Sequence, residues 1–267
     1  MNSITTNKKS KKSFSVKWWA VVLWIALWQI LSLMLKQEIL LVSPISVFRE
    51  MASLLQTADF WGRIAYSWLR IIGGFLLSSS LGLLLAVLAY HRPAVRDLLA
   101  PFILTVKAVP VASFIILLLI WISSENLAVC ISFLMVMPII YTNVLQGMEE
   151  ADRDLLEMAQ VFRLSPYKVL RYIYVPQIFP YFRAACTVGL GLAWKSGIAG
   201  EVIGIPSGSI GEVLYQAKIY LDTPSLFAWT LTIILISLLF EKLFLHLIDT
   251  LLKCLERMGP PHGIHRH

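Results

Sequence analysis

The chain has 267 residues, of which 58% are apolar or aromatic and only 15% are charged. Soluble domains have about 45–50% apolar and about 25% charged residues, so this composition excludes a disordered protein, a collagen and a disulfide scaffold, and it argues against a soluble enzyme. The net charge is +7, but the aromatic residues lie inside apolar runs rather than among basic residues, which argues against nucleic-acid binding and leaves lipid as the expected surroundings.

The chain opens with a basic segment, residues 1–17, which includes Lys8, Lys9, Lys11 and Lys12. An apolar run over 18–35 follows. A basic head before an apolar run also suits a secretory signal, but this run is long and no small-x-small cleavage site follows it. We therefore interpret 18–35 as a first membrane-spanning helix that stays in the protein.

Further apolar runs are each about long enough to cross a membrane as a helix, which takes about 20 residues. Together with the first they predict an all-α polytopic membrane protein with about six transmembrane helices, at 18–35, 65–90, 101–122, 127–147, 179–201 and 225–248. The fifth run is the least apolar. Small residues recur at four-residue intervals in the second and fifth runs and predict close helix contacts there; they are Gly74, Ser78, Gly82 and Ala86, and Gly189, Ala193 and Gly197.

The lysines and arginines predict the orientation of these spans. With the N-terminus in the cytoplasm, sixteen of them fall on the cytoplasmic side and only Lys36, Arg49, Arg63 and Lys218 fall outside. Cytoplasmic segments of membrane proteins are enriched in basic residues. Both termini, including the tail 249–267, are therefore predicted to be cytoplasmic.

The three cysteines, Cys130, Cys186 and Cys254, are far apart in the sequence and form no CxxC pair. Metal and redox chemistry usually requires closer spacing. We interpret all three as small buried apolar residues and predict no metal site.

One long polar stretch, 148–180, separates the fourth and fifth spans. Leu155, Met158, Ala159 and Phe162 recur at the spacing of an amphipathic helix, and acidic residues gather where such a helix begins. After a turn, Ser165 suits the cap and Pro166 the first position of a second helix. This helix is predicted from 167 to about 174, just before Val175 and Pro176. The stretch is thus predicted to be a two-helix knob that docks into a partner, with a solvated loop as the alternative.

The motifs of this stretch resemble the EAA loop of ABC importer permeases, the membrane subunits of ATP-driven importers. The residues that carry the resemblance are Glu157, Met158 and Ala159, then Leu164, Ser165 and Pro166, then Val175 and Pro176. Met158 and Val175 replace the family's Ala and Leu. Arg163 stands where the family has a glycine that suits a tight turn, and a positive φ there costs other residues about 1 kcal/mol or more. Either the turn relaxes or Arg163 makes a contact of its own.

The resemblance extends over about residues 40–250, and within the family the chain is most similar to the nitrate/sulfonate/taurine permease branch. The matching landmarks are Leu41 to Pro44, Ser67 to Arg70, Gly73 to Phe75, Pro101, Lys107, Pro110, Ala112, Ala193, Trp194 and Glu201. It implies a type I ABC importer permease fold over 60–248, with 148–180 as the ATPase-coupling loop.

The same resemblance implies a permease in the bacterial inner membrane that works as a homodimer, surrounded by lipid. Its partners would be a cytoplasmic ABC ATPase subunit and an extracytoplasmic solute-binding protein, which 205–224 would contact unless this segment is a simple packed loop. The chain has no phosphate-binding Gly-x4-Gly-Lys-Ser/Thr motif, so we expect no enzyme activity and no cofactor in this chain, with ATP used by the partner. The solute is expected to be a small anion of the sulfonate, nitrate or taurine type.

Candidates for the translocation path are Lys107, Lys195, Ser196 and Glu201. A lysine inside a span costs several kcal/mol if it faces lipid, so both lysines are expected to face protein or water. Alternatives are a structural pair between Lys195 and Glu201, whose separation of six residues does not match helical pairing, and a Lys107 that extends to the membrane surface. Two other function classes remain: a secondary transporter or channel, which predicts a repeat between the halves, and a membrane scaffold protein.

Overall fold

The computed structural model describes the chain except residues 1–16, 36, 38 and 258–267. The described residues are helical and contain no strand, so the all-α prediction is confirmed for them. The helices are α1 (Trp18–Leu35), α2 (Pro44–Leu54), α3 (Ala58–His91), α4 (Pro93–Ala108), α5 (Val111–Leu118), α6 (Ser124–Glu149), α7 (Arg153–Val161), α8 (Pro166–Val169), η1 (Leu170–Tyr174), α9 (Val175–Gly204), α10 (Ile210–Ile219) and α11 (Thr223–Arg257).

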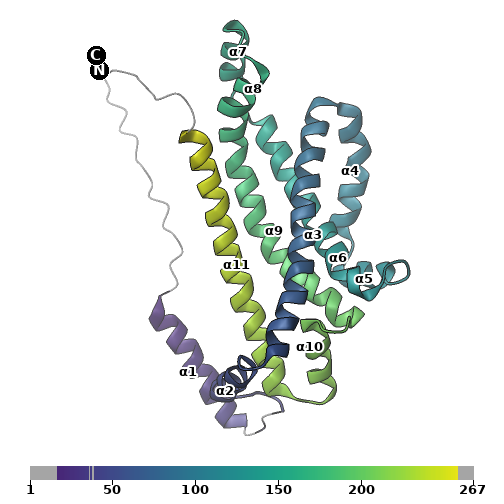
Figure 1. The fold of residues 1–267 in the computed structure, drawn as a ribbon, viewed down its shortest axis with the longest axis vertical. Helices are drawn as coiled ribbons and strands as arrows, with labels where there is room; N and C mark the ends of the chain where they lie inside the picture. Colours follow the sequence, from purple (N-terminus) through teal and green to yellow (C-terminus); the bar gives the residue numbers. More distant parts are fainter. Residues whose placement is uncertain (1–16, 36, 38, 258–267) are drawn as a thin grey trace.

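The long helices α3, α6, α9 and α11 run along the long axis of the molecule (Figure 1). The short helices α7 and α8 lie at the upper end of this view, which we call the loop end. The helices α2 and α10 lie at the lower end, which we call the α10 end. The helices α7 and α8 therefore lie at the opposite end of the molecule from α10.

The helix α6 forms the centre of the bundle, and α3 and α9 pack against it. The predicted small residues make these contacts. A Cβ atom on Gly74 would lie 2.4 Å from the carbonyl oxygen of Val129 in α6, and one on Gly197 would lie 2.6 Å from Ile71 in α3. The predicted close packing of the second and fifth spans is confirmed, because only glycine fits at such separations.

Four helices are long and apolar enough to cross a membrane, namely α1, α3, α6 and α11. The bent pair α4 and α5 forms a fifth candidate. At 30 residues α9 is also long enough, but it is less apolar than the others. It lies against α3 and α6, and many of its side chains are buried within the protein, so it needs less apolar surface.

The predicted third span, 101–122, is not one helix. It breaks between α4 and α5, which meet at 106°. Pro110 has no N–H to continue the helix, and the residue before a proline is disfavoured in helical conformation. Val109 accordingly has φ −76° and ψ 132°, an extended conformation.

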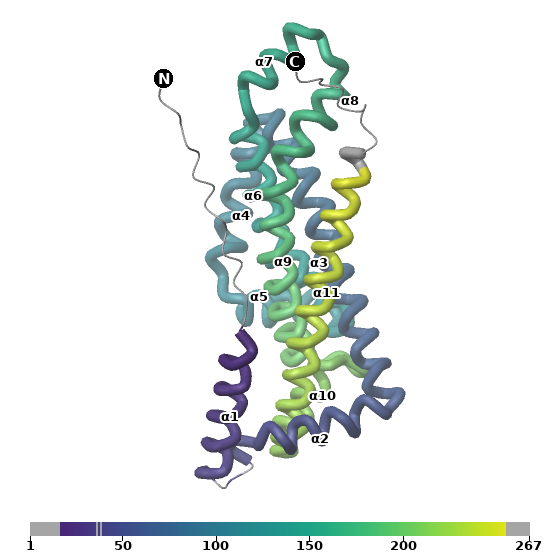
Figure 2. The backbone as a smooth tube through the Cα atoms, turned by 90° about the vertical axis from the view of Figure 1, so that its left-hand side faces the viewer, coloured from purple at the N-terminus to yellow at the C-terminus, as the bar shows by residue number. Residues whose placement is uncertain are grey.

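The helix α1 lies beside the bundle at the α10 end, and α2 runs across this end of the molecule (Figure 2). A few contacts attach α1 to the segment that precedes α2. The Trp28 indole donates to the carbonyl oxygen of Val42 (3.0 Å), and the Ser32 hydroxyl donates to that of Leu41 (3.0 Å). Most other α1 side chains are exposed, as suits a helix surrounded by lipid.

The cysteine prediction is correct in part. Cys186 is buried and Cys130 is partly buried, but Cys254 is exposed on α11. This difference follows from the position of α11 at the edge of the bundle, where one of its faces has no protein neighbour.

Candidate functional site

The polar stretch between α6 and α9 folds into two short helices, as predicted. The first, α7, begins at Asp152, whose carboxylate accepts hydrogen bonds from the backbone N–H groups of Asp154 (2.9 Å) and Leu155 (3.4 Å). Ser165 precedes α8 and Pro166 is its first residue, although the Ser165 side chain makes no capping hydrogen bond. We call residues 151–174 the two-helix loop.

The turn between α7 and α8 is tight and centres on Arg163, which has a left-handed φ of 50°. The N–H of Leu164 donates to the carbonyl of Ala159 (2.9 Å), and that of Arg163 donates to Gln160 (3.0 Å). These two bonds form a Schellman motif, the usual end of a helix that stops at a left-handed residue. The turn has not relaxed to suit Arg163; the arginine has taken the conformation of the glycine.

The second helix does not end before Val175 and Pro176 but continues into α9 through the π-helical segment η1. Pro176 has no N–H, and in a regular helix its ring would collide with the carbonyl of Tyr172. The wider π turn relieves this conflict, with the N–H of Val175 donating to the carbonyl of Leu170. The two-helix loop is therefore continuous with α9, which packs against α6 and α3.

The two-helix loop leaves much apolar surface uncovered. Val161, Phe162 and Tyr167 are 78%, 71% and 65% exposed, and Met158 and Leu170 are about half exposed, whereas Ala159 is buried inside the loop. Glu157 is exposed beside them. Clustered exposure of this kind usually marks an interaction site.

A groove of about 580 Å³ separates the two-helix loop from the bundle. Its apolar walls come from the ends of α3 and α6 on one side and from α8, η1 and α9 on the other. One polar contact crosses it, between the hydroxyls of Tyr90 in α3 and Tyr174 in η1 (3.4 Å). Burial, together with this hydrogen bond, raises the pKa of Tyr174 to about 12, so the contact persists at all physiological pH values.

The predicted path residues do not form one cluster. Lys107 lies in the last turn of α4, and its ammonium is 3.5 Å from the hydroxyl of Thr142 in α6. Lys195 is exposed on α9, and it makes no hydrogen bond or ion pair within the part of the chain that the structure describes. Ser196 is buried, and its hydroxyl donates to the carbonyl of Leu192 (2.8 Å) in its own helix, so it faces no path in this protomer.

Glu201 has other partners than Lys195. Its carboxylate is buried and accepts hydrogen bonds from the Ser67 hydroxyl (2.7 Å) and from the N–H of Gly211 (3.2 Å). It therefore joins α9 to α3 and to α10, and the alternative of a pair with Lys195 is not realised.

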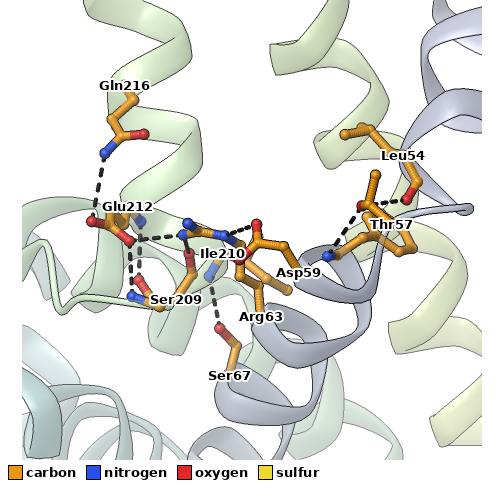
Figure 3. Close-up of polar contacts among 11 residues, drawn as sticks. Leu54, Thr57, Asp59, Arg63, Ser67, Ser209, Ile210, Glu212 and Gln216 are labelled. Carbon is orange, nitrogen blue, oxygen red and sulfur yellow. Dashed lines mark hydrogen bonds and ion pairs between the residues drawn. The ribbon is translucent and has the colours of Figure 1, made fainter.

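A second polar cluster joins α3 to α10 at the α10 end (Figure 3). The Arg63 guanidinium binds Asp59 (2.6 Å) and Glu212 (2.7 Å), and Glu212 also accepts from the N–H of Gly208 (2.8 Å). Burial alone would raise the pKa of Glu212, but the hydrogen bonds from Arg63 and Gly208 outweigh it and hold this pKa below the usual value. Thr57 caps α3 beside this cluster.

Sequence reasoning missed these partners. Ser67 was named only as part of a resemblance, and the separation of 134 residues between Ser67 and Glu201 gives no indication that they meet. Arg70 was also passed over. Its guanidinium stacks 3.6 Å above the Tyr66 ring and donates to the backbone carbonyl of Glu125 (2.7 Å). Tyr66 and Arg70 lie one helical turn apart, a spacing at which side chains often meet.

Comparison with known proteins agrees with this architecture. Residues 78–252 match the family of binding-protein-dependent transport system inner membrane components. The putative aliphatic sulfonates transport permease protein SsuC of Bacillus subtilis is 24% identical over 87% of this chain and 82% of its own length. The taurine transport system permease protein TauC of Escherichia coli is 24% identical over 80% of each chain. The riboflavin transport system permease protein RibX of Chloroflexus aurantiacus is 26% identical over 74% of each.

Proposed function

The chain belongs to the family of binding-protein-dependent transport system inner membrane components and is a permease subunit of an ABC transporter; on this premise we propose that it forms the translocation path of an importer for a small anion of the sulfonate, nitrate or taurine type. It is a transport subunit rather than an enzyme, and membership of the family implies a separate ATPase subunit and a solute-binding protein as partners. The protein is a multi-pass component of the inner membrane.

The exposed apolar surface of the two-helix loop is the observation that carries the proposal, in which the ATPase docks on this surface. Its exposed apolar residues, among them Val161, Phe162 and Tyr167, need a protein partner, because they stand at the end of the molecule rather than beside lipid. Glu157, Met158 and Ala159 belong to α7, the first helix of the loop; the first two are exposed and Ala159 packs inside. Leu164, Ser165 and Pro166 form the turn into the second.

The path of transmission runs through α9. The two-helix loop continues without a break from α8 through η1 and the segment of Val175 and Pro176 into α9. The groove beneath the loop gives it room to shift relative to α3. A push by the ATPase on the loop therefore moves a helix that contacts α3, α5, α6, α10 and α11.

Uncompensated positive charge supports an anionic solute. Within the described residues all four ion pairs lie toward the ends of the bundle, and neither Lys107 nor Lys195 belongs to one. A cation at membrane depth is stable only beside protein or water. Aliphatic sulfonates and taurine, for which two relatives are named, carry a negatively charged sulfonate group, whereas riboflavin carries none. The lysines rather than the family therefore favour a solute with an anionic group.

The proposal extends to the rest of the assembly. The loop end faces the cytoplasm, and the α10 end with residues 205–224 faces the binding protein outside, which places both termini in the cytoplasm. Two copies of the chain form the path between them, surrounded by lipid, so that the lysines exposed in one protomer meet water or the second copy. ATP is used by the partner, and the chain itself carries no cofactor.

The docking proposal is tested with Glu157→Lys and Ala159→Asp. The first reverses a charge on the exposed surface, and the second places a carboxylate in the buried interior of the two-helix loop, so both are expected to weaken docking while the spans remain intact. A tagged chain should co-purify with its ATPase, and the variants should lose this partner and the solute-stimulated ATPase activity in proteoliposomes. Unchanged stimulation at wild-type levels of insertion would exclude the docking role.

The anion proposal is tested with Lys195→Met, using Lys242→Met on the exposed face of α11 as the matched control. Loss of one favourable charge contact of about 1.5–3 kcal/mol predicts uptake reduced by about tenfold to a hundredfold for Lys195→Met and unchanged uptake for the control. Uptake of a radiolabelled sulfonate in proteoliposomes measures this. Wild-type uptake by Lys195→Met would remove this lysine from the path.

A further inference from the structure

Glu201 lies at the far end of α9 from the two-helix loop. Among the residues that the structure describes, it is the only charged side chain that is buried. Its Oε2 atom accepts from the Ser67 hydroxyl (2.7 Å) and from the N–H of Gly211 (3.2 Å), and the Ser67 hydroxyl accepts from the N–H of Ile210 (3.0 Å). One carboxylate thus connects α3, α9 and α10.

The first turn of α10 depends on these two side chains. The first N–H groups of a helix have no partner within the helix. Here the N–H of Ile210 is satisfied by Ser67 and that of Gly211 by Glu201, and the N–H of Glu212 binds the hydroxyl of the capping residue Ser209 (3.0 Å). A negative group also favours this end of the helix dipole. The start of α10 is therefore stable only while α3 and α9 remain together.

The contact between α10 and α9 is backbone against backbone. A Cβ atom on Gly211 would lie 2.3 Å from the Cβ and 2.4 Å from the carbonyl carbon of Glu201. There is no side chain between the two helices that could absorb a displacement. A shift of α9 at Glu201 must therefore move α10 or break its hydrogen bonds.

A second layer closes over the first toward solvent. The Arg63 guanidinium of α3 binds Glu212 of α10 (2.7 Å) and the carbonyl of Ser209 (3.4 Å), as Figure 3 shows. The side chains of Arg63 and Glu212 are only 19% and 18% exposed, so this pair is more than a solvated surface contact.

Both turns that flank α10 are strained. Ile205 before it and Leu221 after it have φ values of 50° and 54°, which branched and bulky residues rarely adopt. In addition, the Oε1 atom of Glu201 is buried without a hydrogen-bond partner. Strain of this kind persists where the surrounding structure enforces it, and it gathers at elements that change arrangement.

We propose that Glu201 is a positioning residue that, with Ser67, latches α10 across α3 and α9, and that release of this latch by movement of α9 opens the extracytoplasmic end of the translocation path. The inference rests on the proposed function, because α9 is the helix that leaves the ATPase-docking loop. From Val175 to Glu201 it spans roughly 39 Å at 1.5 Å per residue, so one helix carries the motion from one membrane face to the other.

The latch is tested first by its effect on ATPase activity in the purified complex. On this proposal the docked, solute-loaded binding protein helps to release the latch, so a weakened latch should let the complex cycle without it. We expect Ser67→Ala and Glu201→Ala to raise the basal ATPase rate about fivefold to tenfold and to lower the stimulation by binding protein, the size of effect that loss of one buried hydrogen bond predicts. Glu201→Gln retains an acceptor oxygen and should stay near the wild type.

The matched control is Ser78→Ala. Ser78 is equally buried on the same helix, but its hydroxyl has no hydrogen-bond partner. A purely structural role for Ser67 would lower basal and stimulated rates together, as a folding defect does. A basal rate for Ser67→Ala equal to that of Ser78→Ala would overturn the latch.

The second test locks the latch and does not depend on the folding of the buried variants. Arg63→Cys and Glu212→Cys are combined in a chain in which Cys130, Cys186 and Cys254 are replaced by alanine. The pair is joined by a short bis-methanethiosulfonate, which forms a reducible disulfide with each thiol and releases methanesulfinate. Uptake in proteoliposomes should cease on crosslinking and return on reduction. Continued uptake by the crosslinked chain would overturn the latch in a complex that still transports. Absence of ATP-driven uptake by the untreated wild type would instead overturn the proposed function, and the latch with it.

Discussion

Arg163 occupies a position for which its side chain is unsuited. A left-handed φ brings the Cβ atom close to the following carbonyl oxygen and costs about 1–2 kcal/mol, whereas glycine adopts it freely. The turn nevertheless keeps its tight form, because the hydrogen bonds of Leu164 and Arg163 close the end of α7. The geometry of the loop is thus retained at some cost in stability.

Replacing this residue should recover that cost. We predict that Arg163→Gly raises the stability of the two-helix loop by about 1 kcal/mol, measured by the protection of its amides from hydrogen exchange. Gln160→Gly is the control, because it introduces glycine at a helical position of α7 and should lower stability by about 0.5–1 kcal/mol. Equal effects of the two variants would mean that the left-handed conformation carries no strain.

The residue scale also marks the limit of sequence reasoning. Arg163 was identified as a departure because a local pattern defines what a turn requires. The partners of Glu201 were not, because hydrogen bonds between Glu201, Ser67 and Gly211 depend on how three helices pack, and no spacing along the chain encodes that. Ser196 was assigned to a path although its hydroxyl binds its own helix, since sequence gives the helix but not the rotation of the side chain.

At the scale of helices, two neighbouring glycines of α3 have opposite surroundings. Gly74 faces α6, where an added Cβ would lie 2.4 Å from the carbonyl oxygen of Val129 and 2.9 Å from the Cβ of Ser132. Gly73 is exposed, with no atom within 4 Å of such a Cβ. Gly74, and not Gly73, is therefore the residue that allows α3 and α6 to approach so closely.

This contrast gives a direct test of the packing. Gly74→Ala should destabilise the protein by about 1–3 kcal/mol, because a backbone atom of α6 must move. Gly73→Ala should leave stability unchanged or raise it by up to about 1 kcal/mol, since alanine favours a helix. Thermal unfolding in detergent compares the two, and a Gly74→Ala protein as stable as Gly73→Ala would show that α3 and α6 are free to separate.

The long helices α1, α3, α6, α9 and α11 were predictable because an apolar run of membrane length leaves few alternatives, whereas the short helices α2 and α10 were not predicted. The third span was not, since the apolar run 101–122 continues through Pro110 and its composition conceals the break. The two-helix loop was predicted from its helical spacing and caps, but the π-helical segment was not, because it arises from the conflict between Pro176 and the carbonyl of Tyr172 inside a continuous helix.

Over the whole molecule, the charges are arranged by depth. Within the described part of the chain, the ion pairs of Arg63 with Asp59 and Glu212 lie at the α10 end, and those of Arg96 with Glu149 and Arg183 with Asp249 lie toward the loop end. Lys107 and Lys195 lie between these two levels and belong to no ion pair among the described residues, so each should face protein or water rather than lipid.

The orientation that the basic residues predict can be tested on intact cells. Ser207 is exposed in the turn before α10, and Gln160 is exposed on the two-helix loop. In a chain without its native cysteines, Ser207→Cys should react with a membrane-impermeant maleimide, and Gln160→Cys should react only after the membrane is permeabilised. The reverse pattern would place the two-helix loop outside and exclude docking of a cytoplasmic ATPase.

The packing of α9 against α3 and α6 has a consequence for insertion of the chain into the membrane. A helix with Lys195, Glu201 and several glycines has a weak tendency to leave the translocation machinery for lipid by itself. Its partners α3 and α6 are synthesised earlier, so they form the surface that receives it, and Ser67 of α3 is already present to bind Glu201. Insertion of α9, the helix that links the two ends of the transporter, therefore depends on the helices before it. The spans are expected to insert cooperatively rather than one by one.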